Sequence, residues 1–159
     1  HNADGFYEPE FINNDCVNCG KCVKACPALN IETKRRDAKF YYGWIKDAEI
    51  RAESSSGGAF TAFAQHVLSE NGVVFGARYA DDFKSVLMSS TEECSLEALR
   101  RSKYCQTISN EMYRKVSEQF KKSKNVMMVG TPCQIAAARR RFGDHENLIL
   151  VDFLCGGET

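Results

Sequence analysis

The sequence predicts a short cysteine-rich segment followed by an α/β domain. Four of the eight cysteines lie within residues 16–26. From about residue 40 onward, apolar stretches of strand length alternate with stretches of helical periodicity, an order typical of helices packed on a sheet. Two glycine-bearing turns directly precede predicted helices. We therefore expect residues 1–30 to form the small segment and residues 31–159 to form an α/β domain with a mixed or parallel sheet.

The first segment carries the spacing C-x2-C-x2-C-x3-C-P, at Cys16, Cys19, Cys22, Cys26 and Pro27. Bacterial-type ferredoxins bind a 4Fe-4S cluster with this spacing. Gly20 lets the backbone approach the cluster without a Cβ clash, and the proline fixes the direction in which the chain leaves the site. We expect the four cysteines to ligate a 4Fe-4S cluster in a ferredoxin-like segment.

Zinc is the main alternative for these four thiols. Zinc sites, however, usually place two cysteine pairs on separate knuckles with a longer spacer between them. Structural thiols are the other alternative, although cysteines this crowded do not all meet disulfide geometry.

The cysteine run also raises a question of completeness. In two-cluster ferredoxins the fourth cysteine of each run ligates the other cluster, and this sequence contains one run. Residues 4–10 look like the middle of a ferredoxin. We therefore expect either that a first ferredoxin half is missing or that the cluster takes a ligand from elsewhere. Because the sequence ends soon after a predicted strand, we also expect the α/β domain to be truncated there.

Composition and charge narrow the class of protein. The chain has 21 basic and 21 acidic residues, so no net field favours nucleic acid or an anionic membrane. No stretch approaches the roughly 20 apolar residues that a membrane helix needs. Thiolates stay available to iron in a reducing compartment. We expect a cytoplasmic protein with no membrane span and no nucleic-acid partner.

The secondary structure follows from local patterns. Residues 40–45 are aromatic and β-branched, which predicts a strand that opens the second domain, and the charged residues 32–37 predict a linker. Ser95 is the expected cap of a helix, and Asn71 begins a helix stop signal. The other predicted strands are 73–76, 86–88, 126–129 and 148–151, and the predicted helices are 58–70, 95–99, 110–122 and 132–141.

The first glycine-bearing turn is Ser54-Ser55-Ser56-Gly57-Gly58. Because it stands before a helix, its hydroxyls and free amides could converge on an anion at the positive end of that helix. The phosphate of a nucleotide cofactor would fit. The alternative is a serine helix cap with glycines that ease the turn, and five residues alone leave both interpretations open.

The second turn, Gly130-Thr131-Pro132-Cys133-Gln134, joins a predicted strand to a helix. Proline suits the first helical position, and the next position places the thiol where the helix dipole favours thiolate. This cysteine could be a cluster ligand, a redox or nucleophilic thiol, or a packing residue. Open α/β sheets bind ligands at the carboxyl ends of their strands, which favours a functional role.

Other candidate side chains have weaker signals. Cys105 and Cys155 could share a sheet edge with the thiol of the second turn, and a second cluster at that edge stays a hypothesis. Cys94 is expected to be a surface or packing thiol. His66 falls among apolar helix positions and is expected to be packed or capped, and His145 is expected in a loop. No catalytic triad can be assembled.

Taken in order, these motifs resemble those of the family of coenzyme F-420 hydrogenase/dehydrogenase beta subunits. The similar stretches are residues 16–27, 51–58, 74–77, 102–104, 130–134 and 151–155, which span nearly the whole chain. The two glycine-bearing turns are the most specific of them. The sequence departs from the family pattern at Gly156, where histidine is common, and at Cys105, where an aliphatic residue is common.

The resemblance implies an iron-sulfur flavoprotein oxidoreductase. In such a protein a 4Fe-4S cluster exchanges electrons with FAD, which passes them to a deazaflavin coenzyme or another acceptor. A redox protein or subunit would be the partner. Together with the turn geometry, the resemblance makes seven residues the candidates for cofactor binding: Ser55, Ser56, Gly57, Gly58, Thr131, Cys133 and Gln134.

Two other functions stay open. The chain could be a non-catalytic relay module that hands electrons to a partner subunit without holding flavin. It could also be a zinc-stabilised binding protein, in which the cysteines bind zinc and the glycine-bearing turns are structural.

Overall fold

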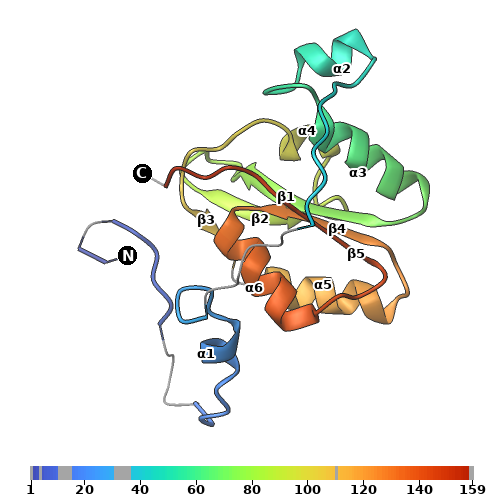
Figure 1. The fold of residues 1–159 in the computed structure, drawn as a ribbon. Coiled ribbons are helices and arrows are strands. Elements are labelled where there is room, and N and C mark those ends of the chain that lie inside the picture. The colour runs from blue at the N-terminus through green and yellow to red at the C-terminus, as the bar shows by residue number, and fades with distance from the viewer. Residues whose placement is uncertain (1, 4, 11–15, 31–36, 110, 158–159) are drawn as a thin grey trace.

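The computed structural model describes residues 2–3, 5–10, 16–30, 37–109 and 111–157. Most of the predicted linker at residues 32–37 lies outside the described residues. The centre of the fold is a five-stranded sheet in the order β3-β2-β1-β4-β5 (Figure 1). Its strands are β1 Val73–Tyr79, β2 Val86–Ser90, β3 Thr107–Ile108, β4 Val126–Gly130 and β5 Leu148–Asp152.

The sheet is mixed, in agreement with the sequence prediction. β4 pairs in parallel with β1 on one side and with β5 on the other. β2 pairs antiparallel with β1, and β3 runs parallel to β2. The parallel strands β4 and β5 are joined by the crossover helix α6, Pro132–Phe142. The carboxyl ends of β4 and β5 therefore lie at the same edge of the sheet.

Helices cover both faces of the sheet (Figure 1). The helices α3, Ala59–Ser69, and α4, Leu96–Leu99, lie on one face, and α5, Met112–Lys121, lies with α6 on the other. Side chains alternate between the two faces because the period of a strand is two. Val74 and Met127 pack toward α3, whereas Val73 and Met128 pack toward α5 and α6. Full burial of such a side chain contributes about 1.5–3 kcal/mol.

The predicted helix ends have visible physical causes. Gly72 follows α3 where a Cβ atom would lie 2.6 Å from Val67 Cγ1, so the chain can turn there only with glycine. Ser95 caps α4, because its Oγ accepts a hydrogen bond from the Ala98 N–H at 3.4 Å. These local signals sufficed to place α3 and α4.

The predicted strand at residues 40–45 is wrong. Within the described residues this segment belongs to no strand, and Phe40 and Tyr42 are 93% and 96% exposed. Aromatic residues favour strands where a neighbouring strand and a half-buried surface are available. The segment has neither, and instead leads to a short helix that was not predicted, α2, Ala48–Ala52, capped by Asp47.

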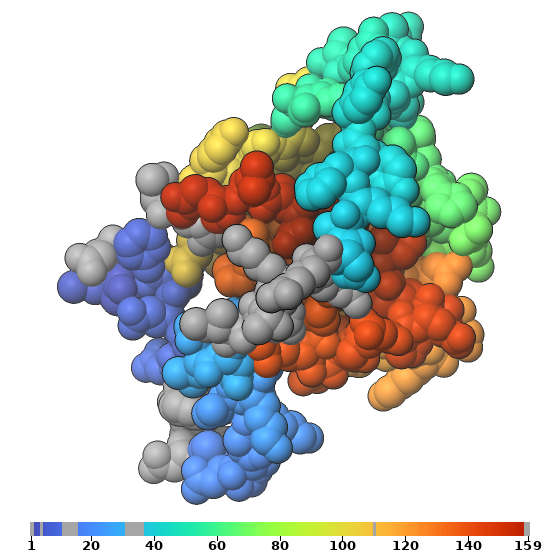
Figure 2. Space-filling view, in the orientation of Figure 1, coloured from blue at the N-terminus to red at the C-terminus, as the bar shows by residue number. Residues whose placement is uncertain are grey.

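The cysteine-rich segment lies against the α/β domain. Its helix α1, Lys21–Ala25, packs on α6 (Figures 1 and 2). Before the cysteines, the Gln106 side chain bonds both the N–H and the carbonyl of Tyr7, at 2.5 and 2.9 Å. After them, the Arg140 guanidinium donates to the Asn30 carbonyl. The segment is thus tied to the domain on both sides of its cysteines.

We predict that Ser123→Gly stabilises the protein. Ser123 follows α5 with φ 55°, exposed to solvent, and its N–H bonds the Phe120 carbonyl at 2.9 Å. The left-handed region costs an L-residue about 1–2 kcal/mol, part of which glycine recovers. The free energy of unfolding measured in urea should rise by about 0.5–1 kcal/mol after the entropy of glycine is subtracted.

Ser117→Gly is the matched control, because Ser117 lies inside the same helix and its Oγ donates to the Tyr113 carbonyl at 3.0 Å. Glycine within a helix is destabilising. Two substitutions of the same sign would contradict the interpretation of the helix end.

Candidate functional site

A cavity of about 770 Å³ opens where the carboxyl ends of β4 and β5 meet the start of α3. This is the edge at which open α/β sheets bind ligands, and the volume falls in the range of small-molecule sites. The cavity is lined mainly by four stretches of chain, residues 54–61, 99–104, 129–131 and 153–157.

The cavity brings together most of the residues that the sequence singled out for cofactor binding. Six of the seven candidates line it: Ser55, Ser56, Gly57, Gly58, Thr131 and Gln134. Two turns that are far apart in the sequence therefore face one space. Cys133, the seventh candidate, is exposed on α6 outside the lining, with its Sγ 3.1 Å from Thr131 Oγ1.

The N-terminus of α3 forms one wall. Gly58 precedes the helix with φ 79°, and no side chain caps the first turn. A Cβ atom on Gly58 would lie 2.6 Å from Ile45 Cγ2, so only glycine fits. The first amides of a helix have no partner within it and carry a partial positive charge. Residues 58–61 line the cavity, so this end of the helix can receive an anion.

Two of the serines in the first turn have other partners. Ser55 Oγ accepts a hydrogen bond from the Ser102 N–H at 3.0 Å, and Ser54 Oγ donates to the Ile50 carbonyl at 2.7 Å. These hydroxyls hold the turn in place. The predicted alternative of a serine cap is wrong, because Gly58 precedes α3 and no side chain caps it; the serines instead hold the turn in place, and anion binding at the open helix end stays a prediction.

The opposite wall was not predicted from the sequence. Arg100 pairs with Glu53, with 2.7 Å between Nη1 and Oε2, and Arg101 Nε donates to the Glu53 carbonyl at 3.0 Å. These contacts join the segment after α4 to the serine-glycine turn. Three basic residues within four positions on a neutral chain were the available signal.

Lys103 holds this wall in shape. Its Nζ donates to the carbonyls of Ala98 and Arg101, each at 3.1 Å, and also to the carbonyl of Arg100. Burial lowers the pKa of Lys103 to about 8, and Cys94 partly opposes that shift. A single side chain thus organises three peptide groups beside the cavity.

Two buried polar atoms at the cavity have no hydrogen-bond partner among the described residues. They are Thr61 Oγ1 and Arg100 Nε. Thr61 is fully buried and the Arg100 side chain is 8% exposed, and both residues line the cavity. Buried polar atoms in folded proteins are nearly always bonded. Both atoms are shielded from solvent, so a bond from either to a ligand in the cavity would require a local rearrangement.

The second turn is built by its own side chains. Gln134 Oε1 accepts the Thr131 N–H at 3.0 Å and caps α6. A Cβ atom on Gly130 would lie 2.7 Å from that Oε1, so a larger residue there would displace the capping side chain. The Tyr113 hydroxyl donates to the Gln134 carbonyl at 3.1 Å. Burial, with a smaller effect of Cys133, raises the pKa of Tyr113 to about 12, so the hydroxyl stays a donor.

The four cysteines of the first segment are free thiols, and three of them are exposed. Gly20 precedes α1 with φ 68°, and the Cys26 N–H donates to the Cys22 carbonyl at 3.1 Å. Asn30 Nδ2 donates to the Val23 and Cys26 carbonyls at 2.8 and 3.1 Å, which closes the loop after α1. The donor set, four unpaired thiols in ferredoxin spacing, suits iron and sulfide.

No metal-binding geometry is assembled among the described residues. Nowhere in that part of the chain do three Cys, His, Asp or Glu side chains lie close enough to hold one ion. The hypothesis of a second cluster from Cys105, Cys133 and Cys155 therefore gains no support. The ligands of the first segment would have to converge on their cluster as it binds.

The remaining candidate side chains have structural roles. Cys94 is partly buried, its Sγ lies 3.4 Å from the Ser90 carbonyl, and burial raises its pKa, as expected of a packing thiol. His66 is not packed, contrary to the prediction, because its side chain is 68% exposed with Nε2 3.9 Å from Glu70 Oε1. His145 lies in a loop as predicted and stacks on Phe120.

In the part of the chain that the structure describes, no helix has the length and apolar character needed to cross a bilayer.

We predict that Gly58→Ala closes the anion end of the cavity. The substitution adds a Cβ at positive φ against Ile45 Cγ2, a combination that should cost about 1–3 kcal/mol of unfolding free energy. Ligand binding at the cavity should also be lost, as measured by flavin titration.

Gly43→Ala is the matched control, because Gly43 also lines the cavity but has open space around its Cβ position. Equal losses of stability and binding in the two variants would contradict the special role of Gly58.

Comparisons with known proteins agree with both parts of the chain. Residues 40–113 match the family model described as coenzyme F420 hydrogenase/dehydrogenase, beta subunit N-term. Residues 8–70 match a 4Fe-4S dicluster domain. That range contains four cysteines, the number that a cluster ligated only by thiolates requires.

One curated relative is a subunit of the F(420)H(2) dehydrogenase of Methanosarcina mazei. It is 24% identical over 157 residues, which cover 94% of this chain and 43% of that protein. The chain thus spans less than half the length of this relative. The motifs, the mixed sheet and both family models agree, and the chain is similar over residues 40–113 to the N-terminal part of the coenzyme F420 hydrogenase/dehydrogenase beta subunits.

Proposed function

We propose that the chain is part of an iron-sulfur flavoprotein oxidoreductase. Electrons would pass between a 4Fe-4S cluster at Cys16, Cys19, Cys22 and Cys26 and an FAD held in the cavity, and then to a deazaflavin coenzyme or another acceptor. The observation that carries this proposal is the single cavity onto which both glycine-bearing turns open.

The cavity offers the contacts that a nucleotide diphosphate needs. A phosphate at the start of α3 would accept bonds from the free amides of the first turn. The buried Thr61 hydroxyl and Arg100 Nε, which lack partners within the described residues, could donate to the same anion. Charged donors in a partly dry site form strong hydrogen bonds. These features favour flavin binding over a relay module without flavin.

The cysteine segment would supply the second cofactor. A cluster carries single electrons and a flavin converts between one- and two-electron chemistry. The protein's contribution is to place the two cofactors. Residues 99–104 line the cavity, and Gln106, two positions later, bonds both peptide groups of Tyr7. One continuous segment thus connects the flavin site to the cluster segment.

The relative suggests a coenzyme and a partner subunit. The Methanosarcina mazei protein is named as a subunit of a dehydrogenase of the reduced deazaflavin F420. We propose by analogy that this chain also works with a partner subunit and exchanges electrons with a deazaflavin.

The first test is anaerobic purification of the intact protein with analysis of iron, sulfide, zinc and flavin. We expect about four iron atoms for each 4Fe-4S cluster, together with bound FAD. Iron without flavin would support the relay module, and zinc without iron would support the zinc-stabilised binding protein. Either result would overturn the proposal.

We predict that Thr61→Val weakens FAD binding. Valine keeps the shape of threonine and removes the Oγ1 that lacks a partner among the described residues. One lost hydrogen bond of about 1–1.5 kcal/mol corresponds to roughly a tenfold rise in the dissociation constant. Stability of the flavin-free protein should stay the same or rise, because a buried unbonded hydroxyl is removed.

Thr91→Val is the matched control. Thr91 Oγ1 accepts the Val74 N–H at 3.2 Å and Thr91 does not line the cavity. This variant should lose stability and keep its FAD affinity. If Thr61→Val leaves FAD affinity unchanged, a phosphate contact at Thr61 is ruled out.

We predict that Gln106→Ala slows electron transfer between the cluster and the flavin. The substitution removes both hydrogen bonds to Tyr7, so the cluster segment should sample more distant positions. Iron and flavin contents should stay as in the native protein. Rapid-mixing spectroscopy of the anaerobic protein would follow the two cofactors separately.

Gln65→Ala, at an exposed position of α3, should leave the rate unchanged. A native rate in Gln106→Ala would show that the contact with Tyr7 does not position the cluster.

A further inference from the structure

We propose that a basic face formed by α1 and the last turn of α6 is the docking surface for a small acidic electron-carrier protein. The inference rests on the proposed function, because it uses the cluster at the four cysteines as the centre that exchanges electrons. It adds the place and the chemistry of the partner.

The basic face is a local excess of charge on a chain that is neutral overall. Residues 16–30 include Lys21 and Lys24 and contain no acidic residue. The α6 helix, residues 132–142, includes Arg139, Arg140 and Arg141 and likewise contains no acidic residue. The whole chain has 21 basic and 21 acidic residues. The acidic residues that balance the five cations of these two elements therefore lie in other parts of the sequence.

The two elements form one surface. α1 packs on α6, and Arg140 donates to the Asn30 carbonyl just after α1. In Figures 1 and 2 the blue residues of α1 lie directly against the orange α6. Lys21, Lys24 and Arg141 are exposed. The charges on α1 and α6 therefore act together on an approaching molecule.

Four of these cations have no ion pair among the described residues, namely Lys21, Lys24, Arg139 and Arg141. Some surface cations on other elements are paired. Arg114 on α5, for example, contacts Glu111 at 2.8 Å and Glu118 at 2.5 Å. The basic face is therefore left with uncompensated charge.

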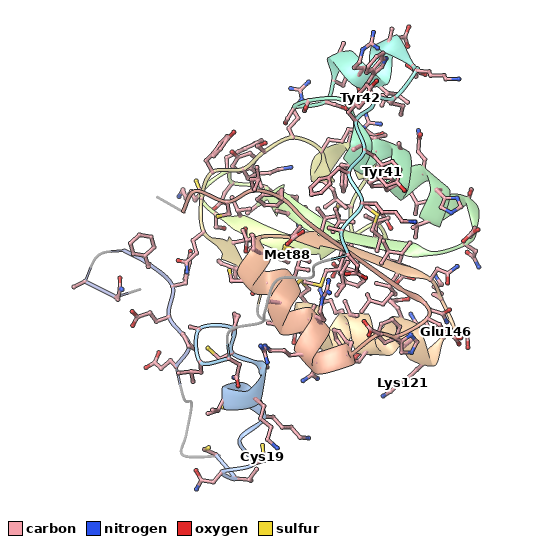
Figure 3. All side chains as sticks on the ribbon, viewed as in Figure 1. Cys19, Tyr41, Tyr42, Met88, Lys121 and Glu146 are labelled. Carbon is pink, nitrogen blue, oxygen red and sulfur yellow. The ribbon has the colours of Figure 1, made fainter. Side chains whose placement is uncertain are left out.

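The acidic residues nearest to α6 in the sequence are Asp144 and Glu146, which follow the helix. Asp15 and Glu32, which flank the cysteine segment in the sequence, lie outside the described residues. Figure 3 shows Glu146 near the loop end of α5, on the other side of α6 from Cys19. The field of the basic face thus extends into solvent on the side of the cysteines.

Position selects the kind of partner. Cys16, Cys19 and Cys22 are exposed beside the lysines of α1. A carrier that docks on the basic face would therefore come close to the cluster. Opposite surface charges steer such encounters and speed association at low ionic strength. In each encounter one electron passes from the reduced carrier to the oxidised cluster, with no bond made or broken.

The test uses the intact cluster-loaded protein and a reduced acidic 2Fe-2S ferredoxin as the probe. The rate constant for cluster reduction should fall as ionic strength rises. Arg139→Glu with Arg141→Glu should lower it at least about tenfold at low salt. Lys21→Glu with Lys24→Glu should do the same. Reduction by a small uncharged photoreductant, which neither docks nor responds to these charges, should proceed at the native rate in Arg139→Glu with Arg141→Glu.

Lys84→Glu with Lys121→Glu is the matched control, because both lysines are exposed and lie on other elements. This variant makes the same change in net charge and should keep the native rate. Equal losses in control and test variants, or native rates in both test variants, would overturn the docking surface. The docking surface would also be overturned if a polyphosphate bound to the basic face and the rate of cluster reduction by ferredoxin stayed unchanged.

Failure of the two proposals can be told apart. A native protein without an iron-sulfur cluster would refute the proposed function. A protein with its cluster, but with no dependence of the ferredoxin rate on these cations, would refute the docking surface alone.

Discussion

The parallel pairing of β1 with β4 is the interaction on which the rest of the structure depends. The register places Val73 opposite Val126 and Val74 opposite Met127, so the first pair is buried on one face of the sheet and the second pair on the other. The helices pack on those side chains, α3 on one face and α5 with α6 on the other. Because β4 also pairs with β5 in parallel, the turns that leave both strands open on one edge. The strand pairing thus sets the position of the cavity, and the loops at this edge supply most of the side chains that line it.

Several residues around the cavity have features that cost stability. Thr61 and Arg100 leave buried polar atoms unpartnered within the described residues, and Arg101 takes a positive φ of 68°. Such features cost stability, and they persist where the surroundings enforce them or a ligand completes them. Here Lys103 holds the backbone in this conformation, because its ammonium group donates hydrogen bonds to three carbonyls of the same segment. These unfavourable features thus lie beside the cavity, where a bound cofactor would offset their cost in stability.

The parts predicted from the sequence are those whose cause is local. Ser95 caps its helix and Gly72 ends another through contacts with neighbours in the sequence, and the alternation of β1 and β4 reflects burial on two faces. The strand predicted from the aromatic residues 40–45 is wrong because a strand needs a partner strand, which no local pattern reveals. The wall at Arg100 was missed for a similar reason. Its conformation is set by Glu53, 47 positions earlier in the chain.

The cysteine segment is too small to hold its own position. A segment of this size has little core, and metal binding usually supplies the order of such pieces. The contacts at Tyr7 and Asn30 are made to the α/β domain on either side of the ligands. The position of the cysteine segment relative to the cavity is therefore set by the domain surface, and changes at Gln106 or Arg140 would alter that position without changing the cysteines or the lining of the cavity.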